Sequence, residues 1–573
     1  MKTHRLAFVL LIGLYSHSGY SQTPNWQWAG AGVCSSLIAA GDIATDMSGN
    51  SYIVGAFDAG GGFNTNIVFG TYNLLCVDWG YQYNGYIAKY DPLGNVIWAK
   101  MIPGDESDDV YITSVSTDVS GNVFVAGYLD GDTVYADSII LTNPNPGTAD
   151  MFIVKYDSSG KVIWADIAGG SGNNYPVKIH TDAMGDVFLT GEFAGSSIIF
   201  GNDSLYNASA IFLHEPEAFI VKYDKNGNVI WAASAGSPDG YSGGLCADNK
   251  GNAYVNGYFV ESTMIFGSDT LTNALSNSVF VAKYDSAGIA VWARTATGNA
   301  WSSGACTDTL GHVYLTGYFS GTNITFDSII LTNASPDSNN IFIAKYDSAG
   351  NVLWAVSAGG KGNNVASGIV TDAQGNIYLT GSFTGQSIIL GNDTLYSINP
   401  LKESLYISKY DTSGHLIWAK IVSGTGSEVA NAISMGPDGS PYIGGYYQNA
   451  IVFGTETLAY AGFQNVFIAK LDTANHIIDT TTGIKPINLT SPITVYPNPS
   501  TGSFYFSGLT EGSTIEVYDM MGQRLNTTSP QPLSQGEGLN SRVLDLSGSP
   551  AGVYFYRVID QGETVQQGKL VVE

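Results

Sequence analysis

Two short phrases alternate along most of this chain, and their repetition constrains its fold more than any other feature. The first phrase, KYDxxGxxxWA, has six complete copies, which end at Ala99, Ala165, Ala232, Ala293, Ala355 and Ala419. Its ending occurs alone at Ala29 and its front half alone near Leu471, so a seventh copy is divided between the two ends. The second phrase, close to TDxxGNxYxTGxF, occurs seven times. A repeat of this kind is typical of one supersecondary unit used many times.

Each unit of about 60 to 70 residues predicts four main strands, because apolar and polar positions alternate. In the unit around Gly375 the expected strands are Ser367 to Thr371, Asn376 to Phe383, Leu405 to Tyr410 and His415 to Ile421. A smaller hairpin is expected between the second and third. The 70 glycines, 35 tyrosines and only 13% charged residues favour short strands and tight turns over amphipathic helices. We therefore expect an all-β protein.

Four-stranded units repeated radially predict a seven-bladed β-propeller over residues 22–478. In this arrangement the N-terminal strand around Trp28 completes the last blade by pairing with Val466 to Leu471, which closes the ring. The repeated tryptophans are expected to pack between blades as core. The aspartates of the Asp-x-x-Gly turns are expected to cap those turns and not to bind a ligand.

The repeats from about Asn25 to Asp472 resemble the SBBP β-propeller repeat family of secreted bacterial proteins. The resemblance rests on FIxKYDxxGNxxWA followed by TDxxGNxYxTGxF, in the same order throughout. It implies the propeller fold and a secreted protein. The family has no single activity, so the resemblance implies no reaction.

The two ends of the chain differ from the repeats between them. Residues 1–21 are expected to be a signal peptide, with Lys2 and Arg5 before an apolar run and cleavage before Gln22. No later run is long and apolar enough to predict a membrane helix. Residues 479–491 are polar and read as a linker. Residues 492–573 predict a small C-terminal β-sandwich, a module that an accessory carbohydrate-binding domain would also use.

The C-terminal segment resembles the type A sorting domain of the type IX (Por) secretion system of Bacteroidetes. The residues that carry this resemblance are Tyr496, Pro497, Asn498, Pro499, Gly552, Tyr554, Arg557 and Lys569. It implies that the translocon and sorting machinery of that system are partners. It also implies a cell-surface or secreted protein, either released or joined to lipopolysaccharide.

The formal net charge is −26, and it becomes −28 when Lys2 and Arg5 leave with the signal peptide. Nucleic acid is excluded as a partner, because it requires basic patches. The acidity serves solubility or, alternatively, cation binding or repulsion from an anionic cell surface. We expect a monomer.

The cysteines are too few for a disulfide framework, and no CxxC predicts a structural zinc site. A disulfide between Cys34 and Cys76 is left open, whereas Cys246 and Cys306 occupy one position in adjacent units and are not expected to pair. No cofactor is expected. The acidic loop from Gly104 to Asp109 is either a Ca²⁺ site or a solvated loop.

The propeller face where loops enter the innermost strands is the expected binding surface. Counting back seven residues from the repeated aspartate gives aromatic side chains in units two to five, and Ala39, Val365 and Asn431 elsewhere. Counting back nine gives carboxylates and amides. The candidate ligand-binding residues are Tyr111, Tyr175, Tyr241, Trp301, Asp109, Asn173, Asp239, Asn299 and Asn363. Rings beside amides suit a glycan or peptide; alternatively, the rings pack between blades and the polar groups bond the loops.

No catalytic constellation is found, so we expect a non-enzymatic binding or adhesion module. His180 lies in an innermost strand and is expected to be buried and hydrogen-bonded or to face the channel. Glu192 replaces an aromatic residue of the repeat and could act as an acid. The alternatives are a polysaccharide lyase or hydrolase on the same scaffold, and a structural or attachment component of the cell surface.

Overall fold

The protein is described by a computed structural model. It describes residues 24–58, 65–76, 82–105, 108–207, 215–236, 239–273 and 277–472, then 494–496, 499–507, 509, 513–518, 524–525, 531–532, 541–560 and 563–572. The expected signal peptide and linker lie outside the described residues. The chain divides into two compact units, one up to Ala474 and one from Asn475. The described residues contain no helix, and so none that is long and apolar enough to cross a membrane.

The first compact unit consists of seven repeats, here called units one to seven, each with four strands in antiparallel order. The innermost strands are β2 (Ile38–Thr45), β8 (Asp109–Thr117), β14 (Asn174–Thr181), β20 (Gly240–Ala247), the end of β25 (Ala290–Thr307), β30 (Asn364–Thr371) and β37 (Glu428–Met435). The second strands are β3 (Ser51–Asp58), β9 (Val123–Asp130), β15 (Val187–Phe193), β21 (Ala253–Phe259), the start of β26 (Val313–Phe326), β31 (Ile377–Phe383) and β38 (Pro441–Tyr447). The third strands are β6 (Tyr83–Tyr90), β12 (Ala149–Tyr156), β18 (Glu217–Tyr223), β24 (Ser278–Tyr284), β28 (Asn340–Tyr346), β34 (Ser404–Tyr410) and β41 (Asn465–Leu471). The outer strands are β7 (Val96–Ile102), β13 (Val162–Gly170), β19 (Val229–Ser234), the start of β25, β29 (Val352–Ala358), β35 (Leu416–Ile421) and β1 (Trp26–Cys34).

Most units also carry the predicted small hairpin after the second strand. These hairpins are β4–β5 (Asn66–Phe69, Tyr72–Leu75), β10–β11 (Thr133–Ala136, Ile139–Thr142), β16–β17 (Ser197–Phe200, Asp203–Tyr206), β22–β23 (Thr263–Phe266, Asp269–Thr272), β32–β33 (Ser387–Leu390, Asp393–Tyr396) and β39–β40 (Ile451–Phe453, Glu456–Leu458), with β36 (Ser423–Gly424) beside β39. In unit five the end of β26 pairs with β27 (Ile329–Thr332) in the same way.

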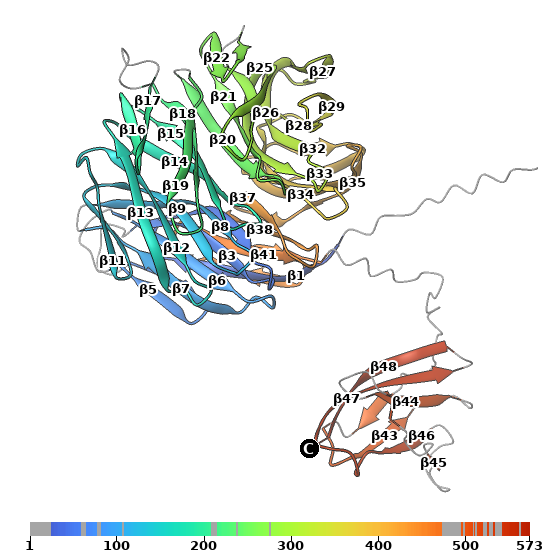
Figure 1. Ribbon diagram of the computed structural model, residues 1–573. Helices are drawn as coiled ribbons and strands as arrows, with labels where there is room; N and C mark the ends of the chain where they lie inside the picture. Colours follow the sequence, from blue (N-terminus) through green and yellow to red (C-terminus); the bar gives the residue numbers. More distant parts are fainter. Residues whose placement is uncertain are drawn as a thin grey trace, which may run out of the picture. The chain divides into compact units, whose positions relative to one another are not determined.

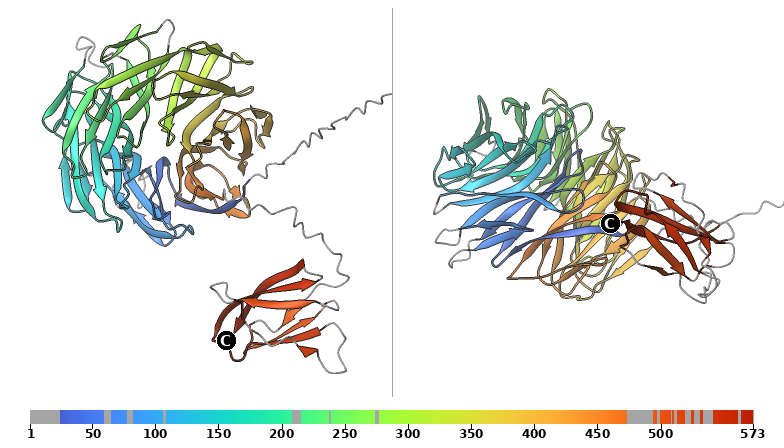
Figure 2. Two further views of the ribbon diagram at one scale, coloured as in Figure 1. Left: turned by 45° about the vertical axis from the view of Figure 1, so that its right-hand side comes forward. Right: turned by 90° about the horizontal axis from the view of Figure 1, so that it is seen from below.

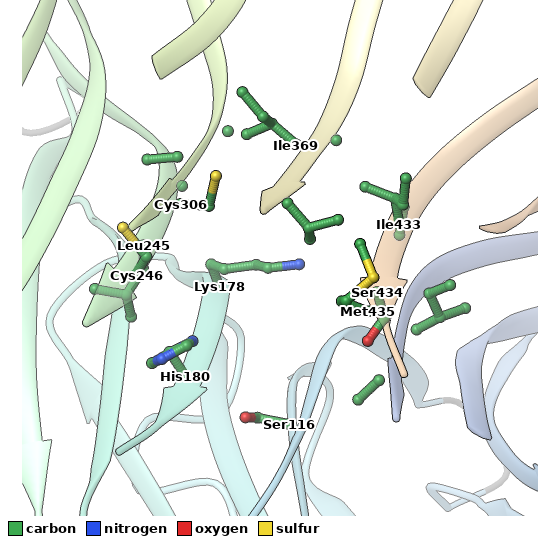
Figure 3. Close-up of a pocket in the computed structure, with 18 of the residues that line it drawn as sticks. Ser116, Lys178, His180, Leu245, Cys246, Cys306, Ile369, Ile433, Ser434 and Met435 are labelled. Atoms are coloured by element: carbon green, nitrogen blue, oxygen red, sulfur yellow. The ribbon is translucent and has the colours of Figure 1, made fainter. Parts of the chain in front are cut away.

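The units follow one another around a common centre, as in a β-propeller (Figures 1 and 2). Each innermost strand packs against the innermost strand of the next unit, and β37 packs against β2. Side chains of these strands line a central cavity (Figure 3). The four strands predicted around Gly375 are confirmed. The first of them begins at Asn364 and not at Ser367, because a bulge between Ala366 and Gly368 interrupts the alternation on which the prediction depended.

The two ends of the repeat region share one sheet, as predicted. Strand β1 pairs antiparallel with β41, with Trp28 opposite Lys470 and Gly32 opposite Val466. Strand β41 also pairs with β38, so the seventh unit takes its outer strand from the start of the chain. A cluster of buried apolar residues joins Trp28 and Val466 of this sheet to Ile53 of the first unit.

The repeated Trp-Ala and Asp-x-x-Gly residues contact each other between neighbouring units. The indole N–H of Trp231 donates to the carbonyl of Ser286 in the next unit (3.1 Å), and Trp28 donates in the same way to Pro92 (2.9 Å). The turn glycine lies against the same indole: a Cβ placed on Gly288 would lie 2.5 Å from the Trp231 ring. Gly288 also has a φ of +83°, which glycine adopts without cost. The two parts of the repeated phrase are therefore complementary halves of one contact between units.

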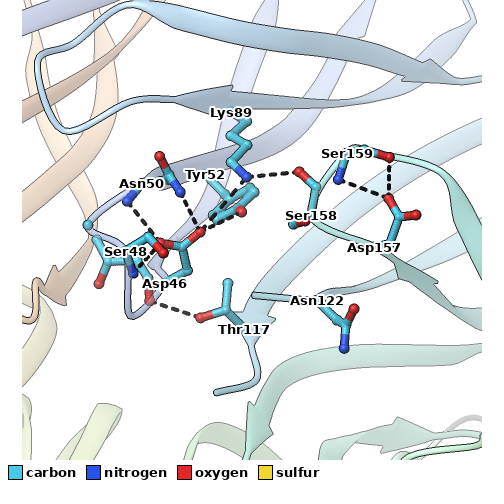
Figure 4. Close-up of polar contacts among 12 residues, drawn as sticks. Asp46, Ser48, Asn50, Tyr52, Lys89, Thr117, Asn122, Asp157, Ser158 and Ser159 are labelled. Carbon is cyan, nitrogen blue, oxygen red and sulfur yellow. Dashed lines mark hydrogen bonds and ion pairs between the residues drawn. The ribbon is translucent and has the colours of Figure 1, made fainter. Parts of the chain in front are cut away.

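The turn aspartates and the strand lysines form a second recurring contact (Figure 4). Oδ1 of Asp46 accepts hydrogen bonds from the N–H groups of Ser48 and Asn50 (2.9 Å each), which confirms that it caps its turn. Its other oxygen accepts from the Tyr52 hydroxyl (2.9 Å). Lys89 lies 5.1 Å from the centre of the Tyr52 ring and donates to a turn carbonyl of the next unit. The repeated Asp, Tyr and Lys residues of the two phrases therefore hold the turns and the contacts between units together.

The second compact unit contains two sheets around one apolar cluster. One sheet consists of β42 (Thr494–Tyr496), β43 (Ser503–Ser507), β45 (Gln531–Pro532) and β46 (Ser541–Asp545). The other consists of β44 (Thr514–Tyr518), β47 (Gly552–Asp560) and β48 (Glu563–Val572). Phe504 and Phe506 of the first sheet and Val517 and Val558 of the second belong to the shared cluster.

Candidate functional site: an aromatic belt and the central cavity

The four predicted aromatic residues occupy equivalent positions at the start of the innermost strands. Tyr111, Tyr175, Tyr241 and Trp301 each precede the bulge of their strand by the same number of residues. On the neighbouring second strands they pair with Tyr128, Glu192, Tyr258 and Tyr318. The second-strand rings belong to the same surface, and sequence reasoning did not include them. The signal was present, because an aromatic residue usually follows the repeated glycine of that strand.

These rings contact one another in series. Tyr83 stacks on Tyr111, which stacks on Tyr128, each at 4.8 Å between ring centres, and Tyr128 meets Tyr175 of the next unit edge-on at 4.9 Å. A second series continues the surface. Its members Tyr241, Tyr258, Trp301 and Tyr318 lie 4.7, 6.4 and 5.2 Å from one ring to the next. All eight rings are partly exposed, and we call them the aromatic belt.

The predicted polar residues lie beside the belt, and hydrogen bonds within the loops occupy most of them. Asp109 accepts from the N–H of Tyr83, and Asn173 accepts from the N–H of Ala149. Asn299 and Asn363 hydrogen-bond to other polar side chains of their loops. Asp239 accepts a long hydrogen bond of 3.4 Å from a belt tyrosine. All five therefore have partners within the protein, and their binding role stays a prediction.

The seventh unit requires a correction to the register used in the prediction. The turn residue equivalent to Asp46 is Gly436, not Asp438, because the turn hydrogen bonds begin at Gly436. The residue that corresponds to Tyr111 is therefore Val429, which pairs with Tyr446. Asn431 instead occupies the bulge. The belt accordingly ends before unit seven.

Glu192 interrupts the belt between its two series. It lies opposite Tyr175, and its carboxylate accepts a hydrogen bond from the N–H of Ser242 in the next unit (3.2 Å). Burial raises the pKa of Glu192 to about 7, and the Ser242 hydrogen bond opposes this shift. A carboxyl group that is half protonated near neutral pH can accept or donate a proton.

Three further carboxylates lie together beside Tyr241, where the second series of rings begins. Oxygens of Glu215, Asp239 and Glu261 are all within 4.8 Å of one another. Burial, then Glu261, raises the pKa of Asp239. In the loop where Ca²⁺ was considered, the buried carboxylate of Asp108 accepts from the N–H of Thr133 (2.8 Å), so it caps the loop. Two other residues of that loop, 106 and 107, lie outside the described part of the chain.

The central cavity has a volume of about 370 Å³. Lys178 reaches into it (Figure 3) and forms an ion pair with the buried Asp42 of unit one at 2.7 Å. Asp42 also accepts from the Ser114 hydroxyl (2.5 Å) of unit two. One lysine thus ties together three consecutive units. Sequence analysis missed this pair, although counting back four residues from the repeated aspartate gives a charged residue only in units one and three.

His180, Cys246 and Cys306 occupy one position in three consecutive units and line the cavity (Figure 3). Burial lowers the pKa of His180 to about 4, so its ring is neutral at pH 7. Burial raises the pKa of both thiols, which makes them weak nucleophiles. Cys34 and Cys76 are also buried free thiols, so the disulfide left open by the sequence is not formed.

Two of the C-terminal residues singled out by sequence, Tyr554 and Arg557, make side-chain hydrogen bonds in the described part. Tyr554 is buried and donates to the carbonyl of Pro550 (2.7 Å). Arg557 is hydrogen-bonded to Glu516 across the sheet and helps to lower the pKa of Glu516. Gly552 begins β47, and Lys569 lies in β48. Pro497 and Asn498 are outside the described residues, Tyr496 ends β42, and Pro499 is exposed.

The fold therefore defines the class of protein: a β-propeller of repeated four-stranded units, followed by a separate β unit. Residues 494–573 match the family described as "Secretion system C-terminal sorting domain". The chain is thus exported by the type IX secretion system to the cell surface or the medium, and the sorting machinery of that system is its partner.

The chain is also 25% identical over 457 residues to an uncharacterised WD repeat-containing protein of Acanthamoeba polyphaga mimivirus. That match covers 66% of this chain and 32% of the relative, so the chain spans about a third of the relative's length. Among solved structures, Sqt1 from Chaetomium thermophilum is similar at 10% identity and a TM-score of 0.35, over 76% of this chain and 87% of Sqt1. A Hadza microbial sialidase is similar at 10% identity and a TM-score of 0.31, over 78% and 94% of the two chains.

Proposed function

We propose that this protein is an exported, non-enzymatic binding or adhesion module whose aromatic belt contacts a glycan or a protein ligand. The observation that carries the proposal is the placement of partly exposed rings at one register position in units two to five. Units one and six have no ring there: Ala39 pairs with Ala56, and Val365 pairs with Ser382. Rings needed only for packing between units would be expected in every unit.

We further propose that the propeller is seven-bladed and closed, and that the C-terminal unit is a β-sandwich. The pairing of β1 with β41 and the contact of β37 with β2 support closure. The apolar cluster shared by two sheets supports the sandwich. A closed ring fixes the belt residues of successive units at constant spacing, as a rigid binding surface requires.

The test compares the full-length protein with the double variant Tyr241→Ala/Trp301→Ala on glycan arrays and against surface proteins. Tyr446→Ala is the control, because Tyr446 is the second-strand residue of unit seven equivalent to Tyr258 and Tyr318 but lies outside the belt. We expect the double variant to lose binding by about tenfold or more and the control to retain it. Equal binding by all three folded proteins would refute the proposal.

One observation favours a second candidate, a polysaccharide lyase or hydrolase on the same scaffold. Glu192 has a pKa of about 7 and lies within the belt, as a general acid at a sugar-binding surface would. Turnover of a polysaccharide that is lost in Glu192→Gln would establish this candidate. Binding without turnover in both the wild type and Glu192→Gln would reject the enzyme and favour the non-enzymatic binding module.

A further inference from the structure

The belt rings differ from the repeated rings near the turns, such as Phe124 and Tyr314, in one respect: the protein supplies them with no cation. In most units a strand lysine lies over a ring near the turn, as Lys155 does over Phe124 (4.7 Å) and Lys345 over Tyr314 (4.9 Å). Among the described residues, no lysine or arginine lies over any of the eight belt rings. The ring surface that the stacked neighbours leave exposed is therefore not occupied by a cation of the protein itself.

Carboxylates lie beside the belt in units two to four. Asp109 and Asp130 lie opposite each other on the paired strands β8 and β9, beside the first series of rings. Glu192 lies between the two series, and Asp239 lies beside Tyr241. Burial is the main cause of the raised pKa values of Tyr111, Tyr175 and Tyr241. Nearby carboxylates raise these pKa values further. The surface is therefore both π-rich and negative.

We propose that the aromatic belt binds a segment of polypeptide that carries arginine and lysine side chains. The inference rests on the proposed binding function and names the chemistry of its ligand. A guanidinium group is planar, stacks on aromatic faces and pairs with carboxylates, so it matches both features of the belt. An extended chain suits the arc better than one compact group, because the rings continue from Tyr83 in unit one to Tyr318 in unit five.

The experiment measures binding of a labelled ten-residue oligo-arginine peptide to the full-length protein by fluorescence anisotropy. The same peptide with citrulline at every position is the neutral counterpart, and a panel of neutral oligosaccharides is the third probe. We expect oligo-arginine to bind and the citrulline peptide to bind at least about tenfold more weakly. Tyr241→Ala/Trp301→Ala should weaken oligo-arginine binding about tenfold, and Tyr446→Ala should leave it unchanged.

These ring substitutions leave the number of carboxylates unchanged, so the loss reports on the belt and not on the overall acidity. If the double variant unfolds, Glu192→Gln provides the alternative, with an expected loss of several-fold. Equal oligo-arginine affinity in the wild type and the belt variants would overturn the inference, as would equal affinity for the citrulline peptide. Belt-dependent binding of a neutral oligosaccharide alone would overturn the inference and keep the proposed function. No binding of any probe would count against both.

Discussion

Replacing Asp150 by asparagine should stabilise the propeller, and increasingly so as the pH rises. Asp150 is fully buried at the start of the third strand of unit two. Its Oδ1 accepts hydrogen bonds from the Asn174 amide (2.6 Å) and the N–H of Gly170 (3.4 Å). Its Oδ2 is buried without a hydrogen-bond partner among the described residues. Burial without a cation therefore raises the pKa of this carboxyl to about 6.

The magnitude follows from that shift. A carboxyl whose pKa rises from 3.8 to about 6 on folding is penalised when ionised, by about 3 kcal/mol at 1.36 kcal/mol per unit. The penalty is absent well below pH 3.8, grows between pH 3.8 and about 6, and is complete above about pH 6. Asparagine is uncharged, so it is not subject to this penalty. It already occupies the equivalent position in other units, as Asn84 and Asn340 show.

The assay is chemical unfolding of the wild type and Asp150→Asn at pH 5 and pH 8. The stability difference in favour of the variant should be larger at pH 8 than at pH 5, by about 1.4 kcal/mol. Asn340→Asp is the reciprocal control, and it should lose stability as the pH rises. A difference between wild type and Asp150→Asn that does not change with pH would refute the reasoning, because it would place the Asp150 pKa near its ordinary value.

Two further predictions concern the contacts between units. In a thermal unfolding assay, Gly288→Ala should destabilise the propeller by about 2 kcal/mol or more, because its φ is +83° and the new methyl group meets the Trp231 ring. Gly311→Ala is the control, since Gly311 has a similar φ but no atom near the new methyl group. It should cost only about 1 kcal/mol. Lys178→Met should cost about 3 kcal/mol, since it leaves the Asp42 carboxylate buried without its cation. The double variant Lys178→Met/Asp42→Asn should recover most of that loss, and no recovery would contradict the ion-pair account.

The repeats made the strands and turns predictable, because local pattern determines them. The alternation of Asn376 to Phe383 and the Asp-x-x-Gly turns needs no knowledge of distant residues. Contacts between units were harder to predict, because they depend on the register of strands far apart in sequence. The bulge beside Gly368 shifts that register by one residue. In unit seven the turn begins at the equivalent residue, Gly436, as in the other units, but its aspartate lies two residues later and misaligned the count.

The candidate site illustrates the same limit. Tyr111, Tyr175, Tyr241 and Trp301 could be found by counting from a repeated residue, because they lie on equivalent strands. Including the rings opposite them, Tyr128, Tyr258 and Tyr318, requires knowledge of how the strands pair. The Lys178 ion pair required more still, because its two partners lie in units one and three and meet only across the central cavity.

The sharing of one sheet by the two ends of the propeller sets the order in which the chain can fold. Strand β1 is made first, yet its partner β41 begins only at Asn465, so about 430 residues separate Cys34 from the strand that it must join. Closing so long a loop is slow, and until it happens β1 and β41 each present a free edge. The earliest segment of the propeller to emerge is therefore the last to find its place, and any factor that shields it in the interval protects the whole molecule from aggregation.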